Sequence, residues 1–304
     1  MIILNKETAN PRDPYVFFYK HKYYALFSLD DCLWMKCGDS LEEIENAEKH
    51  LVYVPKDEYK VSLWAPELHI YDDIPYIYVT AAKEKLGVQH MFVLSHNSKN
   101  ILDPYIKISY LPHTNDGWGI DGTVLEIKKK KYYIYSAFGK YDNELYQALY
   151  ISEMLNPYTL KGKPHLLTRA LYDWEKHGCN GKDRPYVSEG PFALYHHKKT
   201  FVVYSASGCW TDYYCLALLE YLDGDPLDIS NWKKYDAPIL DNSSGFVGPG
   251  HASFIQNDPS GIDYVAFHAY IKDSSLGEGD VRAYIYPLSW KANLPVIDIN
   301  KEEK

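Results

Sequence analysis

The chain has 304 residues, a formal net charge of -9 at pH 7, 24% charged residues and 15% aromatic residues, including 30 tyrosines. Its length is ample for a large core, and the composition excludes disordered, collagen-like and coiled-coil proteins. The acidic balance argues against a nucleic-acid partner, and the wealth of aromatic residues favours β-strands and sugar-stacking surfaces over helices.

A two-strand pattern recurs five times along the chain. In each repeat an apolar strand leads through a short polar turn into a second, largely aromatic strand, which is the signal of a β-hairpin. The paired strands are 15–18 with 23–27, 68–71 with 76–79, 123–127 with 132–135, 192–195 with 201–204, and 253–256 with 264–267. The second strands begin at residues 23, 76, 132, 201 and 264, at intervals of 53, 56, 69 and 63.

Helical patterning is nearly absent. Only Ser40–His50 and a turn after Ser152 look helical, whereas 18 glycines and 17 prolines separate short strands throughout. Five repeats of about 60 residues predict an all-β, five-bladed β-propeller, because radial repetition protects strand edges. We expect one propeller domain over residues 1–304. Two β-sandwich domains fit less well, because no linker breaks the middle of the chain and the repeat count is odd.

One ionisable residue stands at the entrance of each hairpin. In chain order these residues are Asp13, Glu67, Asp121, Glu189 and His251. Any one of them could be a turn former beside glycine or proline, but five in register are hard to explain in that way. The first strand of each blade lines the central channel, so the five side chains should converge at one mouth. Crowded carboxylates acquire different pKa values, and such an acid and base can hydrolyse a glycosidic bond.

Three tryptophans also lie in loops near the predicted mouth. Trp64, Trp118 and Trp210 could stack on sugar rings, although each could equally pack between blades. Cys209 could in principle act as a nucleophile beside His251, but a buried or loop thiol is the simpler interpretation.

These residues stand in motifs that resemble glycoside hydrolase family 43, the inverting five-bladed propeller enzymes that act on arabinans and xylans. The resemblance covers essentially the whole chain. Its elements are Asp13-Pro14, Trp64-Ala65-Pro66-Glu67, Ile120-Asp121-Gly122, Ser188-Glu189-Gly190-Pro191, Gly248-Pro249-Gly250-His251 and Arg282. One such element is weak, but six in this order are specific.

The resemblance implies a role for each matching residue. Asp13 would be the general base, Glu189 the general acid, and Asp121 the carboxylate that orients the acid and tunes its pKa. Arg282 would reach into the substrate pocket. His251 would lie in the central channel near a calcium or sodium ion or an ordered water, so that any metal contact could be indirect, through water. The reaction would require no cofactor.

Two further segments, 204–214 and 224–227, resemble the branch that contains exo-acting α-1,5-L-arabinofuranosidases. This implies removal of terminal α-L-arabinofuranosyl units from arabino-oligosaccharides. Long intervals before the fourth and fifth hairpins provide loops near Asp173-Trp174 and Cys209–Thr211, which we expect to close the pocket beyond one sugar.

Three alternatives remain. A β-xylosidase of the same family commonly carries an additional C-terminal β-sandwich, whereas this chain stops at Lys304. An endo-arabinanase would need an open groove. A catalytically inactive sugar-binding propeller, from a different functional class, is disfavoured because Asp13, Asp121 and Glu189 are all present.

The remaining features bear on location. The N-terminus lacks the pattern of a signal peptide, and no window is long and apolar enough to span a membrane. We therefore expect a cytoplasmic protein without a membrane partner, or a secreted one whose leader has been removed. Five cysteines without a CxxC pair predict reduced thiols. The sequence carries no signal for an oligomeric state.

Overall fold

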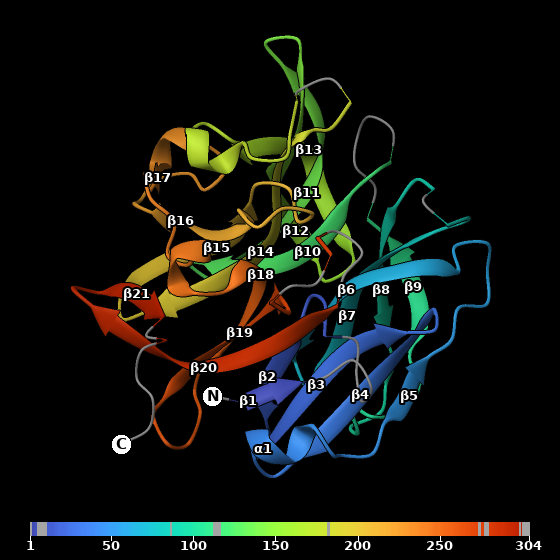
Figure 1. Ribbon diagram of the computed structural model, residues 1–304. Coiled ribbons are helices and arrows are strands. Elements are labelled where there is room, and N and C mark those ends of the chain that lie inside the picture. The colour runs from blue at the N-terminus through green and yellow to red at the C-terminus, as the bar shows by residue number, and fades with distance from the viewer. Residues whose placement is uncertain are drawn as a thin grey trace.

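The computed structural model describes residues 2–4, 11–85, 87–111, 117–180, 183–272, 275–276, 280–297 and 299. Antiparallel β-sheets dominate this part of the chain, and they are arranged around a central axis (Figure 1). The innermost strands β2, β6, β10, β14 and β18 contact one another in a closed ring. The prediction of an all-β, five-bladed propeller is confirmed.

The first three blades each contain four strands in simple succession. Blade one comprises β2 (Tyr15–Tyr19), β3 (Lys22–Leu29), β4 (Cys32–Gly38) and β5 (His50–Tyr53). Blade two comprises β6 (Val61–Tyr71), β7 (Ile74–Ala82), β8 (His90–Ser95) and β9 (Ile106–Tyr110). Blade three comprises β10 (Ile120–Ile127), β11 (Lys130–Tyr141), β12 (Glu144–Asn156) and β13 (Thr159–Thr168).

The last two blades complete the ring. Blade four comprises β14 (Tyr186–His196), β15 (Lys199–Ala206), β16 (Cys215–Tyr221) and β17 (Trp232–Lys234). Blade five comprises β18 (Val247–Ile255), β19 (Asp263–Tyr270), β20 (Val281–Lys291), β21 (Leu294–Ile297) and the N-terminal strand β1 (Ile2–Leu4). Because β1 pairs with β20, the two ends of the described chain meet in one sheet.

The five predicted hairpins pair as expected, from β2 with β3 to β18 with β19. The helical predictions were less accurate. The helix predicted over Ser40–His50 is limited to α1 (Leu41–Ile44), which Ser40 caps. The predicted turn after Ser152 is wrong, because Ser152 pairs with Tyr133 and the strand β12 continues to Asn156. Three short 3₁₀ turns complete the structure: η1 (Asp173–Glu175), η2 (Ile229–Asn231) and η3 (Asn242–Ser244).

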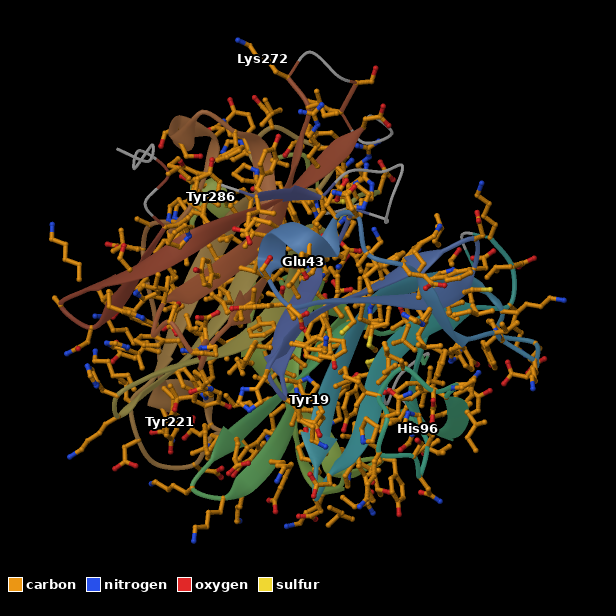
Figure 2. The ribbon with its side chains drawn as sticks, turned by 90° about the horizontal axis from the view of Figure 1, so that it is seen from below. Tyr19, Glu43, His96, Tyr221, Lys272 and Tyr286 are labelled. Carbon is orange, nitrogen blue, oxygen red and sulfur yellow. The ribbon has the colours of Figure 1, made fainter. Side chains whose placement is uncertain are left out.

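The apolar core is divided among the spaces between neighbouring blades. Each of five clusters of buried residues combines side chains from two adjacent blades. Between blades two and three, for example, the rings of Tyr78 and Tyr133 lie 5.3 Å apart, and both are almost completely buried. Figure 2 shows the sheets with their side chains from below. Burial of aromatic rings thus accounts for much of the tyrosine content.

A residue with left-handed backbone conformation recurs within or just before every innermost strand. These residues are Asp13 (φ 51°), Ala65 (φ 43°), Asp121 (φ 56°), Gly190 (φ 53°) and His251 (φ 47°). In blades two to five a register shift in the hairpin accompanies this residue, as in a β-bulge. Bulges redirect side chains, and a left-handed non-glycine residue costs about 1–3 kcal/mol, so the recurrence points to a functional constraint.

None of the described helices is long and apolar enough to cross a membrane.

Candidate active site

The recurrent bulges surround a cavity of about 320 Å³ at one mouth of the channel. The side chains that line this catalytic pocket come from all five blades or the segments joining them: Arg12, Asp13, Ser28, Trp64, Ile120, Asp121, Glu189, Cys209, Tyr214, His251 and His268. The structure therefore brings together four of the five ionisable residues that the repeat pattern singled out.

Asp13 is held between two histidine rings. Its Oδ1 lies 3.0 Å from Nδ1 of His251 and 3.6 Å from Nδ1 of His268. Burial by itself raises the pKa of this carboxyl group, but the charge and hydrogen bond of His251, with a smaller contribution from the charge of Arg12, lower it well below its usual range. Asp13 is therefore ionised across the ordinary pH range and is able to accept a proton.

His251 carries the compensating charge. Burial opposes its protonation, but the carboxylates of Asp13, Asp121 and Glu189 together raise the pKa of His251 to about 10. Within the described part of the chain, no three or more His, Cys, Asp or Glu side chains are grouped so that they could hold a metal. Direct ligation by His251 does not fit this arrangement, and a channel ion reached through water stays a prediction.

His268 fixes the backbone of Asp13. Its Nδ1 accepts a hydrogen bond of 3.1 Å from the backbone N–H of Asp13. Burial lowers the pKa of His268 to about 3, so the ring is neutral and its proton lies on Nε2. This contact holds Asp13 in its left-handed conformation.

Both carboxylate oxygens of Glu189 have a donor. Gln147 donates to Oε2 at 2.6 Å and Tyr214 donates to Oε1 at 2.9 Å. Burial raises the pKa of Glu189, and the negative charge of Asp13 adds to this effect. The charge of His251 and the two hydrogen bonds oppose it without cancelling it. Glu189 therefore keeps its proton to a higher pH than an exposed glutamate does.

Asp121 is tied to the backbone beside Glu189. Its Oδ2 accepts a hydrogen bond of 3.0 Å from the N–H of Gly190. Burial raises the pKa of Asp121 to about 8, with added repulsion from Glu189 and Asp13 and opposition from His251. Gly190 is needed for close approach, because a Cβ there would lie 3.0 Å from the His251 ring.

Glu67 does not join the other four residues. Its carboxylate lies 3.0 Å from Nε2 of His69, and Glu67 does not line the catalytic pocket. The bulge explains the difference, since the left-handed residue of blade two is Ala65, two positions earlier. The shared offset in the sequence was thus only approximate, and Trp64 is the residue of this motif that reaches the pocket.

The predicted sugar contacts divide into two groups. Trp64, which is 36% exposed, and His251 line the pocket. Trp118 instead stacks on Phe138 with ring centroids 4.0 Å apart, and the indole N–H of Trp210 donates to the carbonyl of Gly178. Neither ring lines the pocket, so packing is the better interpretation of both.

Arg282 is a second correction. It is exposed on β20 between the buried residues Val281 and Ala283, and it does not line the pocket. The arginine that does so is Arg12, whose guanidinium lies 5.6 Å from the centre of the Tyr270 ring. Its position next to Asp13 was a usable sequence signal.

Cys209 lines the pocket, but burial raises the pKa of its thiol well above the usual value. A protonated thiol is a poor nucleophile, which favours the simpler interpretation of this residue.

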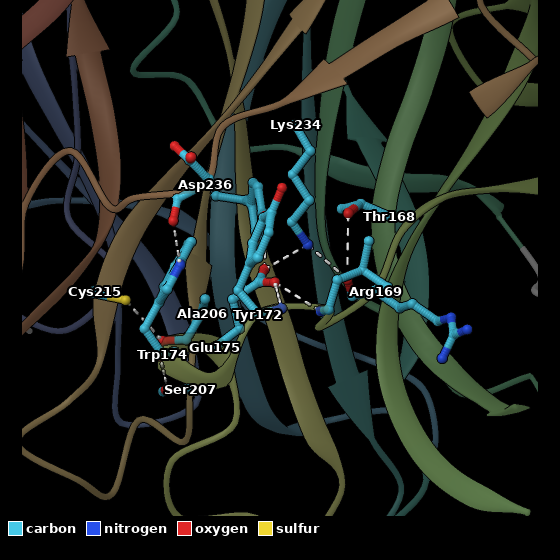
Figure 3. Close-up of polar contacts among 12 residues, drawn as sticks. Thr168, Arg169, Tyr172, Trp174, Glu175, Ala206, Ser207, Cys215, Lys234 and Asp236 are labelled. Atoms are coloured by element: carbon cyan, nitrogen blue, oxygen red, sulfur yellow. Dashed lines mark hydrogen bonds and ion pairs between the residues drawn. The ribbon is translucent and has the colours of Figure 1, made fainter. Parts of the chain in front are cut away.

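A buried ion pair lies between blades three and four (Figure 3). Glu175, which is fully buried, accepts contacts from Lys234 at 2.6 Å and Tyr204 at 2.9 Å. The backbone N–H groups of Leu171 and Tyr172 donate to its other oxygen at 2.7 and 3.0 Å. We call these five residues the Glu175 network. It fixes η1 against the sheet.

The 3₁₀ turn η1 also supports one wall of the pocket. Ser207 donates to the carbonyl of Trp174 at 2.8 Å (Figure 3). It also accepts from the backbone N–H of His177 at 3.1 Å. Ser207 begins the segment 207–214, which brings Cys209 and Tyr214 to the pocket. Asp173 and Trp174 do not line the pocket themselves, and closure of the pocket by the loops near them stays a prediction.

Comparison with known proteins agrees with this geometry. The family model of glycosyl hydrolases family 43 matches residues 7–294. An alpha-L-arabinofuranosidase B of Pyricularia oryzae is 26% identical over 95% of this chain and 61% of its own length. An extracellular exo-alpha-(1->5)-L-arabinofuranosidase of Streptomyces avermitilis is 25% identical over 94% and 62%. This chain thus spans about three fifths of these two relatives.

The solved structures include a relative of similar length. The crystal structure of an alpha-L-arabinofuranosidase from Lactobacillus brevis superimposes with a TM-score of 0.83 and 26% identity, covering 99% of this chain and 97% of that one. The family match covers most of the residues from which the pocket is built. The chain belongs to glycosyl hydrolase family 43.

Proposed function

We propose that the chain is an inverting glycoside hydrolase that removes terminal α-L-arabinofuranosyl units from α-1,5-linked arabino-oligosaccharides. The observation that carries the proposal is the opposite protonation of two carboxyl groups in one pocket. The pKa of Asp13 is lowered by His251, and the pKa of Glu189 is raised by burial. An inverting hydrolase needs such an ionised base and protonated acid.

The reaction follows from these states. Asp13 accepts a proton from a water molecule as that water attacks the anomeric carbon. Glu189 donates its proton to the leaving glycosidic oxygen, so the C–O bond breaks and the released sugar has the inverted configuration. Asp121, through the N–H of Gly190, orients the backbone that carries the acid. After release, proton exchange with solvent restores Asp13 and Glu189.

The substrate rests on two supports. The names of the Pyricularia, Streptomyces and Lactobacillus relatives favour an arabinofuranoside. The pocket volume of about 320 Å³ is near the lower end of the range for ligand sites, about 300–1,000 Å³, and suits one terminal sugar better than an internal chain segment.

One set of assays tests the proposal. Purified protein should release 4-nitrophenol from the aryl α-L-arabinofuranoside in preference to the aryl β-D-xyloside, and Asp13→Asn, which lacks the proposed base, serves as the silenced control. NMR of the first product should show an inverted anomer. Linear α-1,5-arabino-oligosaccharides should release arabinose from the start. Preference for the xyloside would favour the β-xylosidase alternative, and early arabinobiose would favour the endo-arabinanase.

A further inference from the structure

A second cavity lies at the opposite mouth of the channel. Its volume is about 610 Å³, and all five innermost strands or the turns that follow them contribute to it. In each blade the cavity residues come after the left-handed residue, as Phe17 comes after Asp13 and Phe192 after Gly190. At about 3.3 Å per residue, the two mouths are separated by roughly 10–15 Å of strand. We call this the distal cavity.

Aromatic rings form a large part of its wall. Phe17, Phe18, Tyr71 and Phe192 line it and are partly exposed, and Tyr195 is 37% exposed. Flat, partly exposed rings around a concave site are the usual means of binding the apolar faces of sugars.

The ring of Tyr195 is held rigidly in place. Its backbone N–H donates to Gln256 at 3.1 Å, and its carbonyl accepts from the same side-chain amide at 2.6 Å. Its hydroxyl oxygen accepts from the backbone N–H of Glu126 at 2.7 Å. Blades three and five thus fix a residue of blade four, and a ligand would lose little affinity in ordering this ring.

The charged groups at the distal cavity are already paired. Lys131 lies 3.4 Å from Glu126, Lys128 lies 2.7 Å from Asp223, and His69 lies 3.0 Å from Glu67. An anionic ligand would have to compete with these carboxylates for the cations. The cavity therefore favours an uncharged ligand.

Two hydroxyl groups in the wall, those of Tyr71 and Thr123, lack a hydrogen-bond partner among the described residues. Thr123 lines the distal cavity and is 1% exposed, and its hydroxyl forms no hydrogen bond with any residue that the structure describes. Buried hydroxyl groups are usually satisfied, so this one indicates a hydrogen-bonding ligand or a water that such a ligand replaces.

We propose that the distal cavity is a second, non-catalytic binding site for a neutral oligosaccharide. Its identification with an arabino-oligosaccharide rests on the proposed function. A site on the far face would keep a chain attached to the enzyme while another chain end occupies the catalytic pocket, which raises the effective concentration of ends.

Affinity electrophoresis of the full chain tests the site without turnover. Glu189→Gln is run through gels that contain linear arabinan, xylan or polygalacturonate. We expect arabinan to retard it. Adding Tyr195→Ala should weaken the retardation about tenfold in apparent Kd, as for the loss of an aromatic contact. Adding Tyr158→Ala, at a tyrosine of similar exposure (41%) outside the distal cavity, should leave it unchanged.

A milder variant controls for effects of misfolding. Thr123→Val keeps the shape and removes the hydroxyl, and it should weaken retardation while hydrolysis of an aryl arabinofuranoside by the otherwise wild-type chain is unchanged. Retardation that both Tyr195→Ala and Thr123→Val leave intact would overturn the proposal, as would retardation by polygalacturonate alone. Retardation by xylan but not arabinan, lost in Tyr195→Ala, would support the distal site. Failure of the proposed function is seen separately, as failure of the wild type to cleave the aryl arabinofuranoside.

Discussion

The molecule contains two buried clusters of charge that differ in how their charges are balanced. In the Glu175 network one carboxylate meets one ammonium group, and its two oxygens receive four contacts. In the catalytic pocket three carboxyl groups share one imidazolium, that of His251. Burial is the main cause of the raised pKa values of Asp121 and Glu189, and repulsion among the carboxyl groups adds to it.

This difference in charge balance distinguishes a carboxylate that stabilises the fold from a carboxyl group that can transfer a proton. The carboxylate of Glu175 has both oxygens occupied by fixed donors and a cation, so its contacts hold the fold together. A carboxyl group that burial and like charges destabilise as an anion keeps its proton until a substrate can accept it. Substitutions in the two clusters should therefore act on different quantities, one on the rate and the other on stability.

The largest effect is expected for Glu189→Ala. Loss of the acid should lower the rate on arabino-oligosaccharides by about 10²–10⁴-fold. An aryl substrate whose leaving group needs no protonation should lose much less. Comparison of kcat on the two substrates measures this, with the melting temperature as a control for folding. Equal losses on both substrates would remove Glu189 from the role of acid.

Glu175→Gln should have the contrasting effect. It leaves the ammonium of Lys234 buried without its counter-charge, which typically costs about 3–5 kcal/mol of unfolding free energy. Urea denaturation measures the loss, and the double variant with Lys234→Met should recover part of it. The kcat of the protein that remains folded should change little. A large fall in kcat at unchanged stability would show that the two clusters are not distinct.

Asp121→Asn tests the repulsion within the catalytic cluster. Glu189 must be protonated to act, so activity is lost as the pH rises through its pKa. Asp121 and Glu189 repel each other as anions, so removal of this repulsion favours ionisation of Glu189, and the alkaline limb should move to lower pH. The pH dependence of kcat measures the shift. An unchanged limb would mean that Asp121 acts only through the N–H of Gly190.

The smallest effect, and one of opposite sign, is expected for Tyr214→Phe. The phenol hydrogen bond stabilises the anion of Glu189 and so lowers its pKa. Its loss should raise that pKa and move the alkaline limb to higher pH, by up to about one unit. The same pH profile, recorded beside that of Asp121→Asn, gives the sign directly. A shift of both variants in one direction would contradict this description of the cluster.

The sequence was informative where the signal was local and repeated. Aromatic strands recurring in hairpins predicted the propeller, and short motifs before the first strands located Asp13, Asp121, Glu189 and His251 in one pocket. Their catalytic roles stay predictions. Glu67 shows the limit of such counting, because one bulge changes which residue of a motif faces the axis.

Other pocket residues had no comparable signal. Gln147 reaches Glu189 from the third strand of the neighbouring blade, and Tyr214 reaches it from the end of a loop. His268 meets Asp13 across 255 positions of sequence. These contacts depend on the register and twist of sheets that form only when the ring closes. Whether a loop tryptophan reaches the pocket depends on the same closure, and Trp118 stacks on Phe138 instead.

The left-handed position that recurs in each blade bears an ionisable side chain in blades one, three and five, and in blade four the ionisable residue is its neighbour. In blade two the position is Ala65, which bears only a methyl group. A ring with five equal groups would offer a small sugar five equivalent orientations related by rotation about the axis. The apolar sector at Ala65, with Trp64 beside it, removes that rotational degeneracy. A symmetric scaffold thus acquires a unique direction, as a reaction with distinct attacking and leaving groups requires.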